Sequence, residues 1–377
     1  MPLFAPWMGR NIRPPKEEIC AAAATSDGKM IATGSLNGEL KLVSQKDRGP
    51  NSHLLTTSSR YPLHEFGPPV QTLELGQSGR VLICHREAWF SIVETASNST
   101  HEAFQIGESR CHRAAYSDLK KIALLAFREP EDRERIVALR LGPTDSFTFR
   151  DEALDQISDS QRTAATSSIF ENQFSSRIES LCLTADQSMF VVALRGGEVI
   201  CLDTETGTEV ARWANCAQLF RRVTLTAAGN QIISGSHDGW VRWHETKTGR
   251  ILNEWQAHQE VITAIIVDLD RGLVYSATED GKVRSSNVDG ERQRQFVGHD
   301  GAVNALALSP DGSTLASGGS DHKVIVWDTV SGETQLTLDA HIGPVIGLFF
   351  GQDGCLYSTS HDHAVRVWGN QIKSSSR

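Results

Sequence analysis

The sequence predicts an all-β fold in which a small sheet is repeated along the chain and closed into a ring, a β-propeller. The turn residues Asp238, Asp280, Asp321 and Asp362 recur at intervals of 41 or 42 residues. Short apolar runs rich in Val, Ile and Leu surround each of them, and no helical pattern interrupts these runs. A period of about 40 to 45 residues with four short strands per unit is typical of a propeller blade.

The C-terminal half carries the clearest repeats. Residues 315–328 and 356–368 match one another closely, and residues 233–245 and 274–286 follow the same pattern. Residues 192–203 lie one period earlier, with Gly196 at the turn. The N-terminal half repeats more weakly. The whole chain, residues 1–377, is therefore predicted to be one domain of eight units: 19–44, 70–94, 111–141, 178–203, 222–245, 262–287, 303–328 and 345–368.

Eight units favour eight blades over seven, and seven stays open if the first three units contain only two blades. Residues 142–176 are longer than a blade connection needs, and we assign them to an insertion. Little chain follows Trp368, so the outer strand of the last blade needs another source. We expect an N-terminal strand near Leu3–Met8 to fill that position and close the ring.

The strands and turns have the composition that stacked sheets require. In Lys323–Trp327 both faces of the strand are largely apolar, as expected for a strand buried between two neighbouring sheets. Turns such as Asp238-Gly239, Asp280-Gly281 and Asp311-Gly312 supply the residues that tight hairpins favour. One such unit cannot bury its own faces, so stacking and ring closure supply the core.

Composition narrows the classes of partner and compartment. The formal net charge is −9, which disfavours a nucleic-acid backbone as the main ligand. No apolar stretch is long enough to insert into a membrane, and the N-terminus lacks the pattern of a signal peptide. The seven cysteines are scattered without a CxxC pair. We therefore expect a cytoplasmic protein with buried, reduced thiols.

The best-formed unit resembles a known repeat. It reads Gly298-His299, Ser309 to Gly312, Ser317 to Asp321 and Trp327-Asp328. In these features the chain resembles the WD-repeat (G-protein beta-subunit-like) β-propellers, strongly over residues 177–370 and weakly over residues 18–141. The resemblance implies a His, a Ser or Thr, an Asp and a Trp joined in one buried polar network per blade.

By resemblance, these structural residues are His299, Ser317, Asp321 and Trp327 in the seventh unit; His341, Ser358, Asp362 and Trp368 in the eighth; His258, Ser276 and Asp280 in the sixth; and Ser234 and Asp238 in the fifth. The sixth unit has Ser286 in the place of Trp. The fifth has Cys216 and His244 at the His and Trp positions. Within a network, Asp321 would accept from His299 and the Trp327 indole would donate its N–H.

The repetition also bears on catalysis. A His-Ser-Asp set that recurs at the blade period is a structural feature, and no nucleophile elbow accompanies it. His322 and the run His361-Asp362-His363 lie in blade turns, and we assign no metal to them. The sequence thus predicts no enzyme, no cofactor and no metal. The function predicted is a non-catalytic scaffold for protein–protein interaction. The alternative is a propeller enzyme or cofactor-binding protein with a site in the central channel.

Candidate partner-binding residues follow from the resemblance, because partners of such propellers contact defined positions on the narrow top face. These positions are Arg177, Glu179 and Arg195 in the fourth unit, Arg221 and His237 in the fifth, Thr263 and Glu279 in the sixth, Asn304 and Ser320 in the seventh, and Ile346 and His361 in the eighth. Three arginines fall on adjacent blades, which favours an acidic peptide or protein segment as the partner.

Overall fold

A computed structural model gives the fold of this chain. It describes residues 19–24, 30–35, 40–44, 70–75, 80–85, 89–94, 99–105, 110–117, 119–129, 133–141, 166–184, 186–214, 220–225, 231–339, 341–351, 355–362 and 365–368. Within these ranges every regular element is a β-strand, so the expected all-β class is confirmed. Among the same residues no helix is long and apolar enough to cross a membrane.

The strands form antiparallel sheets, which we number in chain order. Sheet 1 contains β1 (Ile19–Ala24), β2 (Met30–Ser35) and β3 (Leu40–Ser44). Sheet 2 contains β4 (Val70–Leu75), β5 (Arg80–His85), β6 (Trp89–Glu94) and β7 (Ser99–Gln105). Sheet 3 contains β8 (Arg110–Ser117), β9 (Ile122–Arg128), β10 (Glu134–Leu141) and β11 (Thr166–Phe174). Sheet 4 contains β12 (Ile178–Leu183), β13 (Met189–Leu194), β14 (Glu198–Asp203) and β15 (Glu209–Ala214).

The second half continues in the same way. Sheet 5 contains β16 (Phe220–Leu225), β17 (Gln231–Ser236), β18 (Trp240–Glu245) and β19 (Ile251–Gln256). Sheet 6 contains β20 (Ile262–Asp268), β21 (Leu273–Thr278), β22 (Val283–Asn287) and β23 (Arg292–Phe296). Sheet 7 contains β24 (Val303–Leu308), β25 (Thr314–Gly319), β26 (Val324–Asp328) and β27 (Thr334–Leu338). Sheet 8 contains β28 (Val345–Phe350), β29 (Leu356–Ser360) and β30 (Val365–Trp368).

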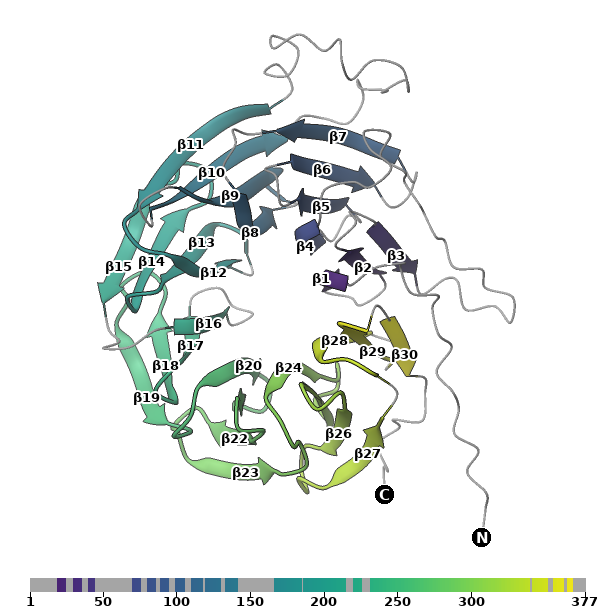
Figure 1. Cartoon of the computed structure of the whole chain (residues 1–377). Helices are drawn as coiled ribbons and strands as arrows, with labels where there is room; N and C mark the ends of the chain where they lie inside the picture. Colours follow the sequence, from purple (N-terminus) through teal and green to yellow (C-terminus); the bar gives the residue numbers. More distant parts are fainter. Residues whose placement is uncertain are drawn as a thin grey trace.

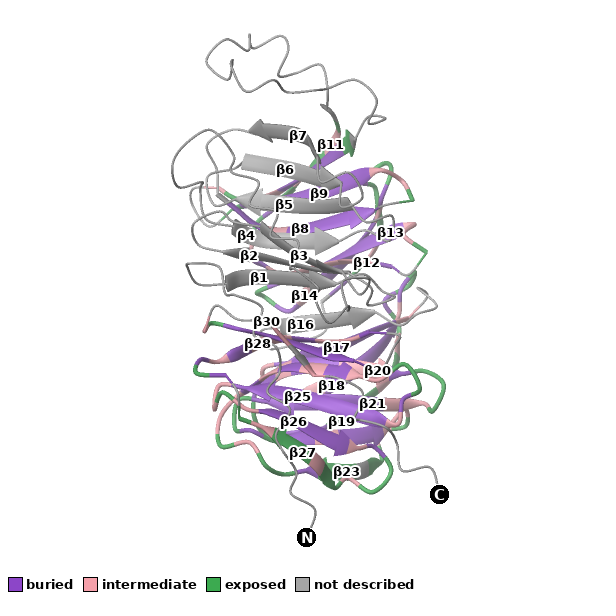
Figure 2. Cartoon of the chain, turned by 90° about the vertical axis from the view of Figure 1, so that its right-hand side faces the viewer, coloured by how far each residue is buried: buried purple, intermediate pink, exposed green. Residues whose placement is uncertain are grey.

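The sheets follow one another around a common centre, with the first strand of each sheet innermost (Figure 1). Consecutive first strands contact one another, as β20 does with β24 and β24 with β28. Strands β1 and β29, from the first and last sheets, also contact each other. Middle strands such as β13 and β25 are buried along their length because a sheet covers each of their faces (Figure 2).

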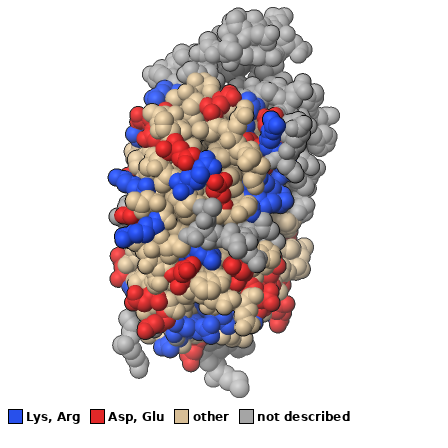
Figure 3. Space-filling view, turned by 90° about the vertical axis from the view of Figure 1, so that its left-hand side faces the viewer, with Lys and Arg blue, Asp and Glu red and all other residues tan. Residues whose placement is uncertain are grey.

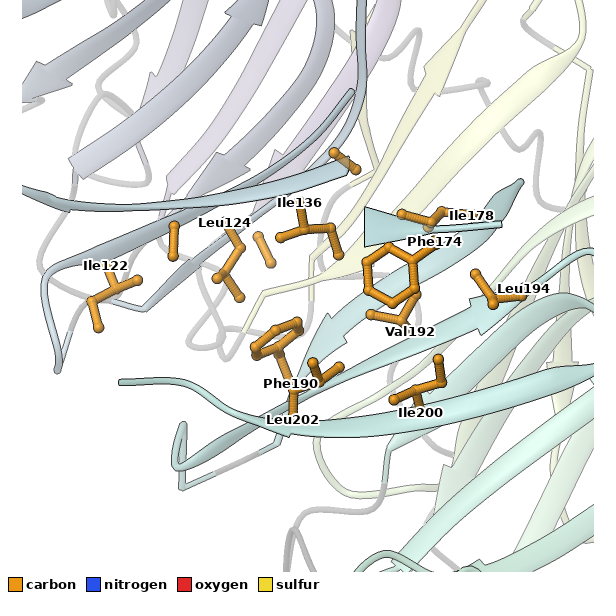
Figure 4. Close-up of a cluster of buried hydrophobic side chains, with 13 residues drawn as sticks. Ile122, Leu124, Ile136, Phe174, Ile178, Phe190, Val192, Leu194, Ile200 and Leu202 are labelled. Carbon is orange, nitrogen blue, oxygen red and sulfur yellow. The ribbon is translucent and has the colours of Figure 1, made fainter. Parts of the chain in front are cut away.

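The core lies between successive sheets. In Figure 4, Leu124 and Ile136 of sheet 3 face Phe190 and Val192 of sheet 4, and all four side chains are fully buried. A second cluster joins sheets 6 and 7 through aromatic contacts. The Phe296 ring lies edge-on against Trp327, with 5.7 Å between the ring centroids. Apolar surface buried between neighbouring sheets therefore holds the repeats together, as the two-sided apolar strands require.

The third unit extends further than the sequence indicates. The stretch 142–176, which we assigned to an insertion, contains β11, and β11 pairs with β10 as the outer strand of sheet 3. Its polar residues, as in Glu171-Asn172-Gln173, suit an outer strand and hide the strand signal in the sequence. Residues 142–165 lie outside the described residues.

One local feature repeats in every first strand and could not be read from the sequence. The register shifts at its second residue, or at the third in β8, so that one extra residue forms a β-bulge. The bulge residues are Cys20, Gln71, His112, Glu179, Arg221, Thr263, Asn304 and Ile346. A bulge redirects the side chain that it carries, so these residues occupy equivalent places at one end of the sheets.

Candidate functional site

The bulges and the turns between second and third strands lie at the same end of the sheets, which we call the bulge face. A backbone hydrogen bond recurs there: Arg195 N donates to Arg177 O, and Ser320 N donates to Ala302 O. Glu279 and His361 make the equivalent bond in sheets 6 and 8. In each case the turn residue bonds to the residue two places before the bulge. Sheet by sheet, this bond brings the predicted partner-binding residues together.

Two of the predicted contact residues fasten neighbouring sheets to each other. The Thr263 hydroxyl of sheet 6 donates to the Val303 carbonyl of sheet 7. The Asn304 amide of sheet 7 donates to the Val345 carbonyl of sheet 8, with Nδ2 and O 3.0 Å apart. In both cases the acceptor is the residue that precedes the next bulge. These side chains therefore link one sheet to the next rather than standing free for a ligand.

Sheet 3 has a link of the same kind that the sequence analysis missed. His112 is its bulge residue, and His112 Nε2 lies 3.4 Å from the Ile178 carbonyl of sheet 4. The same nitrogen lies 3.0 Å from the Glu134 carboxylate, which is 1% exposed and accepts a hydrogen bond from Ile178 N at 2.7 Å. No spacing in the sequence marks this pair, because His112 and Glu134 come from different strands and do not recur in other units.

Glu179, the bulge residue of sheet 4, is surrounded by arginines. Its Oε1 lies 2.9 Å from Nε of Arg195 and 3.6 Å from Nε of Arg177. Arg113 of sheet 3 donates from Nε and Nη2 to the Glu179 carbonyl, both at 3.3 Å. We call Arg113, Arg177, Arg195 and Glu179 the arginine cluster. Two guanidinium groups thus pair with the Glu179 carboxylate at the bulge face, and a third donates to the Glu179 backbone carbonyl.

Arg113 is a member of this cluster that the sequence did not identify. Burial lowers the pKa of its guanidinium. The negative charge of Glu179 opposes this shift, and the positive charge of Arg177 adds to it. Its Nη1 also donates to the His112 carbonyl at 3.1 Å. Arg113 follows the bulge residue of sheet 3 directly, so knowledge of the bulge position would have pointed to it.

The remaining predicted contact residues are placed as follows. Glu279 and His361 are exposed on the bulge face, while His237, Ser320 and Ile346 are half-buried there. Arg221 is the bulge residue of sheet 5, and its side chain lies outside the described residues. The mixed character of this set leaves the arginine cluster as the main concentration of like charge among the predicted residues.

The polar network of the seventh unit is closed on itself. His299 Nδ1 lies 2.9 Å from Asp321 Oδ2, and His299 Nε2 lies 2.8 Å from Ser317 Oγ. The Trp327 indole N–H donates to the same hydroxyl at 2.8 Å. Burial alone would raise the pKa of Asp321. The backbone amide of Asp300 and the neighbouring His299 outweigh that effect and hold this pKa below its usual value.

The eighth unit has the same geometry. His341 Nδ1 lies 2.9 Å from Asp362 Oδ2, and its Nε2 lies 2.7 Å from Ser358 Oγ. The Trp368 indole donates to Ser358 Oγ at 2.9 Å. In both units the imidazole is fully buried, so these residues hold strands together and face no open space.

The sixth unit departs from this geometry. His258 Nε2 lies 2.8 Å from Ser276 Oγ, but Asp280 does not bond to His258. Asp280 instead accepts from the Thr278 hydroxyl and pairs with Lys282. His258 Nδ1 consequently has no hydrogen-bond partner among the described residues, and burial, reinforced by Arg284, lowers the pKa of His258 to about 4.

In the fifth unit the predicted residues are not joined to one another. Ser234 Oγ donates to the Arg242 carbonyl at 3.5 Å, and Asp238 accepts from Ser236. His244 is buried in the Trp position, where burial lowers its pKa to about 4. Cys216 lies outside the described residues. Among residues with described side chains, no three His, Cys, Asp or Glu are placed to hold a metal ion.

Comparison with known proteins identifies two of the repeats. The family described as "WD domain, G-beta repeat" matches residues 290–328 and 332–369. Ribosome biogenesis protein YTM1 of Meyerozyma guilliermondii is 29% identical over 126 residues, which are 30% of this chain and 27% of that protein. Small ribosomal subunit protein RACK1 of Glycine max is 36% identical over 80 residues, which are 21% of this chain and 24% of that protein.

These alignments reach only about a quarter of each relative's length. The likeness in fold extends much further. The crystal structure of the computationally designed Ika8 protein superposes with a TM-score of 0.70 at 18% identity, covering 96% of this chain and 98% of that one. The family match falls on the last strand of sheet 6 and on sheets 7 and 8, and the polar networks of sheets 7 and 8 are complete.

Proposed function

We propose that this chain, which belongs to the WD40-repeat family, is a non-catalytic scaffold that binds other proteins through its bulge face. The proposal rests on the way its polar residues are used. The His-Ser-Asp sets are buried inside sheets 7 and 8, whereas Arg177, Arg195 and the turn residues of the bulge face remain accessible. Those accessible groups can form contacts without disturbing the core.

The partners that fit this surface are proteins or peptides in the cytoplasm. Two relatives carry names that place them in ribosome biogenesis and in the small ribosomal subunit, which supports a partner within a larger assembly. The formal net charge of −9 supports a protein component of such an assembly over its nucleic acid.

We also propose that the sheets are eight blades of one closed ring. Contact between β1 and β29 supports closure between the last and first sheets. Sheet 8 has three strands among the described residues, and a strand from the N-terminal segment near Leu3–Met8 completes it. A closed ring fixes the bulge residues relative to one another, which a binding surface spread over several sheets requires.

Affinity purification with quantitative mass spectrometry tests the binding function. We expect the double variant Arg195→Ala/Arg221→Ala to lose proteins that the unaltered chain retains. The matched control is Arg212→Ala, because Arg212 lies on the outer strand β15 and pairs with Glu198 and Glu209 rather than with the arginine cluster. Equal recovery of every partner by the double variant and by the control would contradict the proposal.

A further inference from the structure

We infer that the arginine cluster is a carboxylate-binding site in which Glu179 stands in for an acidic side chain of the partner. This inference rests on the proposed scaffold function and specifies the chemistry of its ligand. When the partner docks, an Asp or Glu side chain takes over Arg177 and Arg195, and the Glu179 carboxylate gives way to it.

The first argument is that Glu179 behaves differently from the other bulge residues whose side-chain contacts are described. His112, Thr263 and Asn304 occupy the equivalent bulge and reach a carbonyl of the next sheet. An ionised carboxylate has no hydrogen to donate, so Glu179 cannot form this link. Its side chain turns to the arginines instead. The residue at this bulge therefore organises charge rather than fastening sheet 4 to sheet 5.

The second argument is that the cluster holds more donors than Glu179 can satisfy. Each guanidinium carries five N–H groups, and one carboxylate accepts from only a few of them. The buried Nε of Arg177 has no hydrogen-bond partner among the described residues. Arg177 and Arg195 set two positive charges against the one Glu179 carboxylate, while Arg113 donates to backbone carbonyls. A guanidinium group can bind a carboxylate through two parallel N–H···O hydrogen bonds, so the cluster has N–H donors available for a second carboxylate.

The third argument is access. The side chains of Arg195 and Arg177 are 52% and 38% exposed, whereas that of Glu179 is 16% exposed. A ligand therefore meets the arginines first. Since the arginine side of these pairs is open to solvent, a better-placed carboxylate can compete with Glu179 for the two guanidinium groups.

The small size of the arginine cluster favours a short acidic protein segment over RNA. On the side of the molecule formed by the outer strands, acidic and basic residues alternate without forming a basic track (Figure 3). A polyphosphate chain needs such a track, whereas a short acidic segment needs only a local cluster.

The test measures fluorescence anisotropy of a labelled oligoglutamate peptide with the full chain. Glu179→Gln keeps the shape of the side chain and removes the internal competitor, so we expect binding to tighten by about threefold to tenfold. Arg195→Ala should weaken binding by about fivefold. Arg212→Ala, the outer-strand control, should bind as the unaltered chain does. Added salt should reduce the affinity in every case.

Glu179→Gln binding equal to or weaker than that of the unaltered chain overturns the inference, as does a labelled oligouridylate that binds more tightly than the peptide. Circular dichroism checks that each variant is folded. The exposed position of Arg195 makes that variant a second, independent probe. If oligoglutamate does not bind while the purification still shows partners that depend on Arg195 and Arg221, the scaffold function stands and the carboxylate site fails.

Discussion

Single side chains decide whether a polar network closes. In sheet 6 the Thr278 hydroxyl bonds to Asp280, and the aspartate is thereby held away from His258. In sheet 8 the equivalent Ser360 donates to the Gly343 carbonyl, which leaves Asp362 to pair with His341. Sheet 7 has Gly319 at this position and no competing hydroxyl. The residue two places before the turn Asp thus controls the histidine's partner.

Gly319→Ala tests the influence of this position on the His–Asp pair by adding a single carbon atom. A Cβ at Gly319 would lie 2.6 Å from His299 Nδ1, so the His299–Asp321 pair would have to shift. We expect a loss of about 1–3 kcal/mol in the free energy of unfolding. Urea denaturation measures the loss. Gly196→Ala is the control, because nothing lies within 4 Å of a Cβ placed there. A similar small effect for both variants would show that the pair tolerates the added carbon.

At the scale of strands, the bulges make the first strands of sheets 3, 6 and 7 connectors to the next sheet. Each bulge side chain of the right chemistry reaches forward to the next sheet, as Thr263 and Asn304 do. These hydrogen bonds supplement the apolar contacts between sheets. Because a hydrogen bond is directional, it also prevents one sheet from sliding along the next, which apolar contacts do not.

Thr263→Val removes one such bond at nearly constant volume. The Val303 carbonyl would lose the hydroxyl that now donates to it, so we expect a cost of about 1 kcal/mol in chemical denaturation. Thr248→Val is the matched control, because the Thr248 hydroxyl bonds within an exposed turn, donating to Glu245 and accepting from the Arg250 amide. The linking role is refuted if Thr248→Val costs as much as Thr263→Val.

The strands of the C-terminal half were predictable because apolar period and turn chemistry agree there. The bulges were not, since residues as unlike as Ile346, Thr263 and Glu179 occupy one backbone position. The arginine cluster was half predictable. Arg177 and Arg195 sit at repeat-defined positions, whereas Arg113 reaches in from the preceding sheet, a contact that no single unit contains.

At the scale of the whole molecule, the sheets of both halves of the chain are arranged around a common centre (Figure 1). Sheets with strong repeat signals and sheets with weak ones occupy equivalent places, and strands β1 and β29 meet between the first and last sheets. The fold thus depends on apolar strands of the right length in each unit more than on the signature residues, which are concentrated in sheets 7 and 8.

Deleting residues 1–17 tests the proposed closure. If the N-terminal segment supplies the outer strand of sheet 8, its removal leaves an open edge and should lower the melting temperature by several degrees. Differential scanning fluorimetry measures the change. Removal of the polar tail 373–377 is the control and should leave the melting temperature unchanged. Equal melting of both shortened chains would assign the closing strand to another segment.

The forward-reaching bonds of the bulges have a consequence for how such a molecule can change in size. A unit such as residues 303–344 carries the Asn304 amide for its successor and the Val303 carbonyl for its predecessor. Duplication of that unit would duplicate both the side-chain donor and the backbone acceptor of the hydrogen bonds between sheets. Genes for this kind of protein can therefore gain a repeat by duplication without first evolving a new junction.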